Sequence, residues 1–235
     1  MPGYYGYGYG LDPTMVILIP AILFTMYAQF KVSSTTSKYL RVNAQRGYSG
    51  EQVARKILDS NGLYNVSIEM VRGHLSDHYD PRRKVVRLSQ DIYYGTSITS
   101  ISVAAHECGH AIQHAKGYAP LNFRSALVPV VNFSSSISWV LILLGFIMPT
   151  MGGFLKLGIL LFAASVLFQL VTLPVEFNAS NRAVVQLANL GIVDDREKKQ
   201  SRDVLTAAAL TYVAAALTSV LQLLRLLAIA NRNND

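Results

Sequence analysis

Apolar residues gather in four long runs along this 235-residue chain, and more polar stretches separate the runs. The runs cover residues 14–30, 126–148, 154–175 and 204–230. A helix needs about 20 predominantly apolar residues to cross a bilayer, so the first three runs predict transmembrane helices. The fourth run carries Gln222 and Arg225, and it predicts a helix that either crosses the membrane or lies along it.

Residues 31–120, between the first two runs, have the patterns of a small water-soluble unit. The stretch YSGEQVARKILDSNG begins with a capping box formed by Ser49 and Gln52, and it predicts a helix. The stretches YNVSIEMV and KVVRLS predict strands, with DHYDPRRK as the turn between them. The stretch SITSISVAAHECGHAIQHA predicts a second helix, so the expected order is helix, strand, strand, helix.

Two further segments differ from the apolar runs in composition. Residues 1–13 begin with the Gly/Tyr-rich stretch MPGYYGYGYG, and they predict a flexible tail near the membrane interface. Residues 176–203 are charged and predict a segment outside the membrane. The expected fold class is therefore an α-helical integral membrane protein that carries a small α+β unit.

Composition and charge agree with a membrane protein. Hydrophobic residues make up 51% of the chain and charged residues only 15%, whereas charged residues average about 25% in soluble domains. Lys and Arg gather in residues 31–125 and 176–203, and residues 1–13 and the turn PTMGG have none. The positive-inside rule then predicts a multi-pass protein of the plasma membrane with both basic regions in the cytoplasm.

Several other function classes lack their sequence signals. Neither a Gly-rich phosphate loop nor the spacing of a zinc finger occurs. The basic run PRRK has no interleaved aromatic residues, so it predicts a solvated turn near anionic lipid headgroups and no nucleic-acid partner. Cys108 is the only cysteine, which excludes an intrachain disulfide.

The stretch HECGH, residues 106–110, points to metal chemistry. On a helix, His106 and His110 lie one turn apart on the same face and can hold one ion. Neutral imidazoles suit zinc, and Glu107, turned by about 100° around the helix axis, faces water at the ion. Glu107 is the expected general base, which passes a proton from water to the leaving amine. The alternative is a helix with incidental polar residues, which would need buried partners.

A third ligand is expected from a distant part of the chain. Glu176, in TLPVEFNAS, lies at the end of the third apolar run and is the only acidic residue between Glu107 and Asp194. A carboxylate beside a membrane helix is costly without a partner, and a zinc ion is such a partner. The alternative is an acid at the membrane interface that caps the next segment.

His114 repeats the four-residue spacing, but we do not expect it to bind the same ion. On a continuous helix it stands about 12 Å from His106 along the axis, and the three residues between His110 and His114 provide no helix break. We expect His114 near the end of the helix. Cys108 faces about 200° away from His106, so we expect it to pack in the core.

Three separated motifs, HECGHAIQH, DHYDPRRKVVRLS and LPVEFNAS, resemble the bacterial neutral zinc metallopeptidase family typified by YugP. More distantly, they are similar to membrane gluzincins of the HtpX type. The resemblance runs from about residue 30 to the end of the chain, and it implies a zinc-dependent, membrane-integrated peptidase of undefined substrate. Carried over by position, it makes His106, His110 and Glu176 the zinc ligands and Glu107 the base.

The resemblance also has implications for neighbouring residues. Gluzincins commonly place Asp four residues after the ligand Glu to orient a ligand histidine. Here Ser180 occupies that position, with Asn178 and Asn181 nearby, and either a hydroxyl or an amide could orient the histidine more weakly. In gluzincins the strand before the active-site helix is a sheet edge that pairs with extended substrate. This implies substrate binding by Val86, Arg87 and Leu88 in KVVRLS. The alternative for this strand is an ordinary place in the core.

The loop before that strand allows two interpretations. His74, Asp77 and His78 could form a second metal cluster, or they could shape the loop beside the active site. His78 or Tyr79 could also stabilise the oxyanion of a tetrahedral intermediate.

The predicted function is that of a membrane-integrated zinc endopeptidase acting on a peptide or a membrane-protein substrate at the lipid bilayer. Two alternatives stay open: a non-catalytic zinc-binding membrane scaffold, and a protease that a partner must activate. Structural zinc sites are usually closed by four protein ligands, so three ligands and a base favour catalysis. Whether the chain forms a homo-oligomer or binds a membrane-protein partner also stays open.

Overall fold

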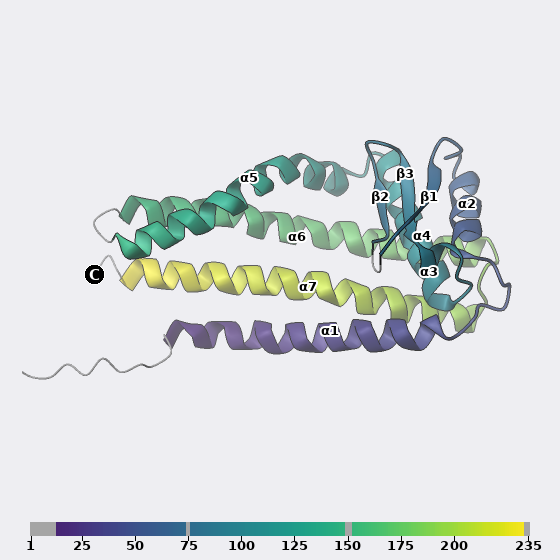
Figure 1. The fold of residues 1–235 in the computed structure, drawn as a ribbon, viewed down its shortest axis with the longest axis horizontal. Coiled ribbons are helices and arrows are strands. Elements are labelled where there is room, and N and C mark those ends of the chain that lie inside the picture. Colours follow the sequence, from purple (N-terminus) through teal and green to yellow (C-terminus); the bar gives the residue numbers. More distant parts are fainter. Residues whose placement is uncertain (1–12, 74–75, 149–151, 233–235) are drawn as a thin grey trace, which may run out of the picture.

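Four long helices dominate the structure, a computed structural model that describes residues 13–73, 76–148 and 152–232 (Figure 1). A 3-10 helix, η1 (Pro13–Leu18), leads into the first of them, and the four are α1 (Ile19–Leu40), α5 (Ala119–Ile147), α6 (Gly152–Asn189) and α7 (Asp195–Arg232). Each is long and apolar enough to cross a membrane. Between 11% and 28% of each apolar stretch is buried, so most of its side chains can face lipid.

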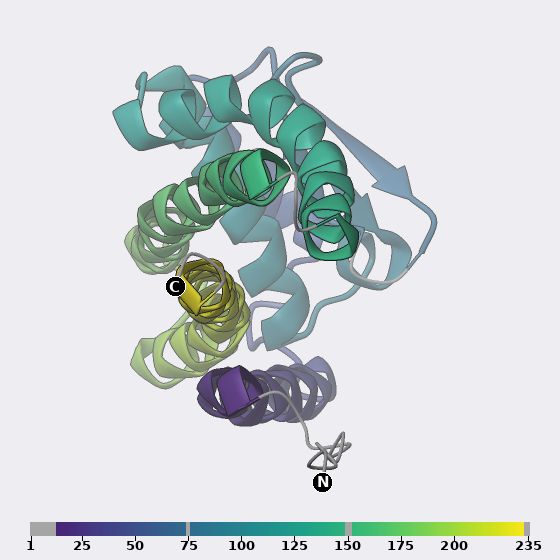
Figure 2. The same ribbon diagram turned by 90° about the vertical axis from the view of Figure 1, so that its left-hand side faces the viewer.

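The long helices stand side by side in the order α1, α7, α6, α5, and they form an open arc around α4 (Ile98–Ala115) (Figure 2). In Figure 1, α1 and α6 run toward the small unit, whereas α5 and α7 run away from it. Both ends of the described chain therefore lie together, at the far end of the helices from the small unit.

Two long helices continue beyond their apolar runs into the small unit. α1 runs past Phe30 to Leu40, and α6 runs past Glu176 to Asn189. Residues 176–203, for which the sequence predicted only a charged segment outside the membrane, are mostly helical, and only the short connection between α6 and α7 interrupts the helices.

Pro174 lies inside α6 without ending it. A proline has no N–H to donate, and it weakens the hydrogen bonding of the helix around it. Side chains from outside α6 also bond to its backbone here: the Tyr118 hydroxyl donates to the carbonyl oxygen of Pro174 at 3.5 Å, and the Gln113 amide donates to that of Val175 at 2.8 Å. α6 therefore continues through Pro174, and Glu176 lies on the same helix just beyond its apolar run.

The small unit contains α2 (Gly50–Ser60), β1 (Ser67–Val71), β2 (His78–Asp80), β3 (Val85–Ser89), α3 (Gln90–Tyr93) and α4 in this order. The expected helix-strand-strand-helix order holds for α2, β1, β3 and α4. β2 and α3 are additional, and β2 falls in the stretch DHYDPRRK that predicted only a turn.

The strand order contradicts the expectation that KVVRLS forms a sheet edge. β3 is the central strand, because it pairs in parallel with β1 and antiparallel with β2. Val86 and Leu88 are fully buried, and the Arg87 guanidinium donates to Glu69 and Asp80. β1 and β2 both pair with Val86 and Arg87, so a substrate strand cannot add at these two residues. β2 does not reach Leu88, and substrate binding at Leu88 stays a prediction.

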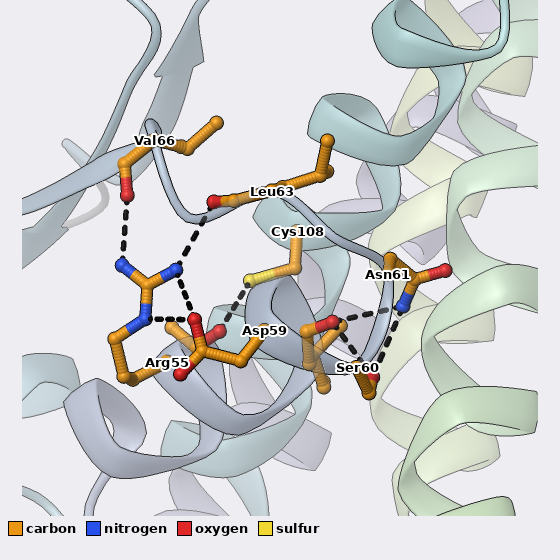
Figure 3. Close-up of polar contacts among 9 residues, drawn as sticks. Arg55, Asp59, Ser60, Asn61, Leu63, Val66 and Cys108 are labelled. Carbon is orange, nitrogen blue, oxygen red and sulfur yellow. Dashed lines mark hydrogen bonds and ion pairs between the residues drawn. The ribbon is translucent and has the colours of Figure 1, made fainter.

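A polar network joins α2 to the chain that leads into β1 (Figure 3). The Arg55 guanidinium forms an ion pair with Asp59 at 2.8 Å and donates to the carbonyl oxygens of Leu63 and Val66 at 3.1 and 2.9 Å. The Cys108 thiol donates to the backbone carbonyl of Ala54 in the same helix. Burial raises the pKa of this thiol, so Cys108 stays protonated and packs in the core.

The core of the small unit surrounds α4. It lies where α2, the sheet, α4 and the neighbouring ends of α6 and α7 meet, and its fully buried members include Val53, Ile57, Leu58, Leu88, Ile98, Ile101 and Leu187. Fully burying one such side chain contributes about 1.5–3 kcal/mol. α4 is therefore held firmly against α6, which positions the residues described next.

Candidate metal centre

α4 carries the stretch HECGH and is fixed at both ends. The Ser97 hydroxyl caps its N-terminus by accepting a hydrogen bond from the Ser100 amide at 3.0 Å. After its C-terminus the chain turns at Gly117, whose φ of +62° favours glycine. His106 and His110 project from one face of this helix, and their ring centroids lie 4.7 Å apart.

Glu176 on α6 meets both histidines. Its Oε2 atom lies 3.3 Å from Nε2 of His106 and 3.6 Å from Nε2 of His110. The three ligand atoms lie within 4.8 Å of one another, and within the described ranges no other group of His, Cys, Asp and Glu side chains converges in this way. The structure thus brings together the three residues predicted as ligands.

The surroundings of Glu176 fit a bound cation. Its side chain is only 4% exposed, and Oε2 is buried without an aligned hydrogen-bond donor. A buried carboxylate oxygen is costly unless a donor or a cation faces it. Two imidazole nitrogens and one carboxylate oxygen are also the donor set of catalytic zinc sites, so these residues fit zinc.

The surroundings of His110 also favour positive charge. Burial lowers the pKa of the His110 imidazole, but its contact with Glu176 and the charge of Glu107 outweigh burial and raise this pKa overall. The two carboxylates therefore make this pocket a place where positive charge is stabilised.

Gly109 allows α4 and α6 to approach closely enough for these contacts. A Cβ atom at position 109 would lie 2.6 Å from the carbonyl oxygen of Ala179 and 3.2 Å from its Cα. Ordinary contacts between carbon and oxygen are longer, about 3.3–3.6 Å. Any side chain at this position would therefore push α6 away and move Glu176 out of reach of His106 and His110.

Polar side chains hold the Nδ1 atoms of the two histidines. The Ser180 hydroxyl lies 3.2 Å from Nδ1 of His106, which is the orienting position that the family resemblance implied. Oε1 of Gln113 lies 3.0 Å from Nδ1 of His110. With both Nδ1 atoms engaged, the Nε2 atoms are the ones directed at Glu176.

Gln113 was not found by sequence reasoning. It is fully buried, and its amide nitrogen donates both to the backbone of Val175 and to Oδ1 of Asn178 at 3.0 Å. Asn178 in turn accepts from Arg182 at 2.7 Å. A glutamine on an Ala-rich helix carries no local signal of burial, because burial depends on how α6 packs against it.

Glu107 faces a cavity rather than the ligands. It is 8% exposed, and it lines a cavity of about 490 Å³ between α1, α4 and α7, together with His106 and Ser180. The general base predicted from the sequence therefore lies beside open space that leads to a ligand. A catalytic metal site requires such space, because substrate and water must reach the ion.

Tyr212 on α7 is a second residue that the sequence did not reveal. It lines the same cavity as His106 and Glu107, from the side of α7. In the sequence it is one tyrosine in an apolar run. Only the packing of α7 beside α4 shows that it faces the site.

The other aromatic and histidine candidates lie elsewhere. The Tyr79 hydroxyl lies 2.9 Å from Nδ1 of His114 at the C-terminal end of α4, and burial raises the pKa of Tyr79 to about 12. Nδ1 of His78 lies 2.7 Å from the carbonyl oxygen of Ser76. Neither Tyr79 nor His78 is among the described residues that line the cavity, so the geometry does not support an oxyanion role for them.

The predicted second metal cluster includes His74, which lies outside the described residues, so this cluster stays a prediction. Asp77 accepts hydrogen bonds from the amide and the hydroxyl of Ser89, at 2.7 and 3.0 Å. It therefore shapes the loop beside the cavity.

The comparisons with known proteins agree with this geometry. Residues 14–231 match the model of a family described as "Putative neutral zinc metallopeptidase". The chain belongs to this family. It is also 50% identical over 219 residues to "Putative membrane protease YugP" from Bacillus subtilis (strain 168), in an alignment that covers 93% of this chain and 97% of that protein. No solved structure matches.

Membership in this zinc metallopeptidase family gives the cluster a chemical context. The family implies zinc, and His106, His110 and Glu176 are the residues of the described chain that converge as metal ligands. The relative named a membrane protease and the four apolar helices agree that this is a membrane protein.

Proposed function

We propose that this protein is a zinc-dependent endopeptidase in which His106, His110 and Glu176 hold the ion and Glu107 is the general base. The observation that carries the proposal is the buried Oε2 atom of Glu176, which faces two imidazole nitrogens and has no aligned donor. A purely structural polar network would normally satisfy this atom. The family to which the chain belongs supports the choice of zinc and of peptide hydrolysis.

A bound zinc ion would polarise the substrate carbonyl and lower the pKa of a water molecule to about 7. Glu107 lines the cavity beside His106, so its carboxylate can accept a proton from water and return it to the leaving amine. Ser180 and Gln113 keep the two imidazoles in one orientation. The Tyr212 phenol, on the facing wall, is placed to donate a hydrogen bond to the developing oxyanion.

The decisive test separates metal binding from catalysis. We expect purified wild-type protein to hold about one zinc ion per chain and to cleave a fluorogenic peptide library. Glu107→Gln should keep the zinc and lose about 10²–10⁴-fold in kcat. If Glu107→Gln is as active as wild type, the general base is another residue, and the assignment is overturned.

The proposal includes a multi-pass topology with the site on the cytoplasmic side. Two observations support it: the basic residues gather in 31–125 and 176–203, and the two described ends of the chain lie together, far from the small unit (Figure 1). A cysteine introduced at the exposed Arg82 should react with an impermeant maleimide only after cells are opened. Labelling in intact cells would place the site outside.

A non-catalytic zinc scaffold is the competing function. Structural zinc sites are usually closed by four protein ligands, whereas three ligand residues converge in the described chain and a cavity reaches the neighbouring Glu107. Wild-type protein that holds zinc but cleaves nothing, with or without its native membranes, would favour the scaffold. Activity that appears only with the membranes would instead identify a partner-gated protease.

A further inference from the structure

A second cavity continues the one at Glu107 along the seam between α1 and α7. Its volume is about 360 Å³, and Gln29 and Thr211 line both cavities. The rest of its wall consists of small or hydroxyl-bearing side chains: Thr25, Ala28, Ala214, Ala215, Thr218 and Ser219. These residues lie in the apolar spans of the two helices. The two cavities are therefore adjacent, and together they reach from the membrane-embedded seam to the candidate catalytic groups; we call this pair of cavities the track.

The track fits an extended peptide better than a lipid chain. An extended backbone in hydrocarbon leaves its N–H and C=O groups unpaired, and each unpaired group costs several kcal/mol. The wall offers the Gln29 amide and the Ser219 hydroxyl to pair with them, and the Thr211 hydroxyl, which donates to a backbone carbonyl of α7, can still accept from a peptide N–H. The Thr25 hydroxyl, bonded to Thr218, becomes available when the seam opens. Its small residues also let a backbone approach closely. A lipid tail would need none of these polar groups.

The end of the track in the small unit is acidic. Asp77, Asp91 and Glu107 line the first cavity, and none of the described residues in its wall is Lys or Arg. Asp77 accepts hydrogen bonds from Ser89 and Asp91 has an interaction of its own, so the negative charge of this wall, and not an unpaired oxygen, faces the cavity. Between this acidic end and the seam the wall is largely apolar, with Val32 and Val103 among its members. This pattern is complementary to a peptide in which an apolar stretch is followed by positive charge.

α1 is the helix that can open the seam. It is at one end of the helix arc, beside α7 (Figure 2). Its outward surface exposes large apolar side chains, namely Ile22, Leu23, Met26 and Phe30. The hydroxyls of Thr25 and Thr218 meet across the seam at 3.4 Å. Separating α1 from α7 would therefore open the track to lipid while the contacts of α6 with α4 stay in place.

We infer that the substrate is a membrane-embedded segment with an apolar stretch next to basic residues, and that it reaches the site laterally between α1 and α7. This inference rests on the proposed peptidase function. The apolar stretch lies in the seam, and the basic residues face Asp77 and Asp91. Hydrolysis adds one water molecule across the peptide bond at this junction and yields a new carboxylate and a new amine.

The first test compares three synthetic peptides in nanodiscs that contain the zinc-loaded protein. One has an apolar segment followed by Lys-Lys, one has the same segment followed by Glu-Glu, and one has a Gly/Ser segment followed by Lys-Lys. We expect kcat/KM to be about tenfold or more higher for the first peptide than for either other. Asp91→Asn should reduce the preference for Lys-Lys over Glu-Glu, and the exposed Asp195→Asn should leave it unchanged. Equal cleavage of all three peptides would overturn the inference and leave the peptidase function standing.

The second test locks the seam. A Thr25→Cys/Thr218→Cys protein can form a disulfide across it, and the buried Cys108 does not compete. We expect oxidation to abolish cleavage of the membrane-embedded peptide but not of a short water-soluble peptide, and reduction with a phosphine to restore it. If the oxidised and reduced forms cleave the embedded peptide equally, the substrate does not pass between α1 and α7.

A binding measurement keeps the inference separate from catalysis. In the inactive Glu107→Gln protein, a photo-crosslinking residue at Val32 should capture the apolar Lys-Lys peptide, whereas the same residue at Phe146, on the outer surface of α5, should not. Crosslinking at Val32 without any cleavage by wild type would retain the track and reject the peptidase. Equal crosslinking at both positions would reject the track.

Discussion

Two groups of histidine and acidic side chains lie close together in this protein, and they differ in how completely their polar atoms are paired. The sheet cluster contains His78, Tyr79, Asp80, Arg87 and His114. Its members bond to one another or to the backbone: Tyr79 to His114, Arg87 to Asp80, and Asp80 to the amide of Arg82. The metal cluster of His106, His110 and Glu176 instead converges on a buried oxygen with no aligned donor.

The comparison shows that residue type alone does not identify a reactive site. Both clusters contain histidine and a carboxylate, and both lie near α4. In the sheet cluster the hydrogen-bonding capacity is used within the protein, so these residues stabilise the loop and the sheet. In the metal cluster some hydrogen-bonding capacity is unused, and the atoms concerned, Oε2 of Glu176 and the Nε2 atoms of the two histidines, converge. Four measurements test this difference, in decreasing order of expected effect.

The largest effect is expected when one carboxylate is removed from each region. Glu176→Ala should reduce bound zinc from about one ion per chain to a small fraction, since a catalytic zinc site has only three protein ligands. Glu69→Ala removes a carboxylate that pairs with Arg87 in the sheet and should leave the zinc content unchanged. Metal analysis of both purified proteins decides. A full zinc content in Glu176→Ala would show that Glu176 is not a ligand and that the two regions do not differ in this respect.

The next effect concerns the close approach of α4 and α6. Gly109→Ala places a Cβ against Ala179, and overpacking of this kind costs about 1–3 kcal/mol. We expect a lower melting temperature and weaker zinc retention against a chelator. Gly153→Ala is the matched control, because a Cβ at that helical glycine has no neighbour within 4 Å, and it should be neutral or slightly stabilising. Equal melting temperatures and equal zinc retention in the two variants would show that the site does not require glycine at position 109.

A smaller effect is expected from the group that orients His106. Ser180→Ala should weaken zinc affinity by about 10–100-fold, the usual range for residues that position metal ligands. Ser89→Ala removes a serine hydroxyl that is bonded to Asp77, and it should lower stability without changing zinc affinity. Competition titrations with a chromogenic chelator measure both. Similar losses of affinity would show that the two regions are coupled.

The smallest effect is the pH dependence contributed by the sheet cluster. The amide of Arg83, the guanidinium of Arg87 and the amide of Arg82 hold the pKa of Asp80 below its usual range. The ionised form is thus favoured in the folded protein, so its stabilisation is present above the ordinary carboxyl pKa and is lost as the pH falls through the folded value. The difference in Tm between zinc-free wild type and Asp80→Asn should therefore shrink from pH 6 to pH 3. A Tm difference that grows as the pH falls would contradict a lowered pKa of Asp80 in the folded protein.

The metal cluster was accessible to sequence reasoning because its signals are local or rare. The helical period alone brings His106 and His110 to one face, and Glu176 is conspicuous as a lone acid at the end of an apolar run. The central position of β3 was not accessible, because its second neighbour, β2, is a three-residue strand hidden in a turn. Gln113 and Tyr212 were missed because only tertiary packing decides which way they face.

The site is divided between two distant parts of the chain, and this division sets an order during biosynthesis. His106 and His110 leave the ribosome well before Glu176, which arrives only when the helix that carries it has been inserted into the bilayer. Until then the two imidazoles form an incomplete chelate. Under the proposed function, a nascent chain that stalls before α6 lacks its third zinc ligand, so maturation of the peptidase is tied to completed membrane assembly.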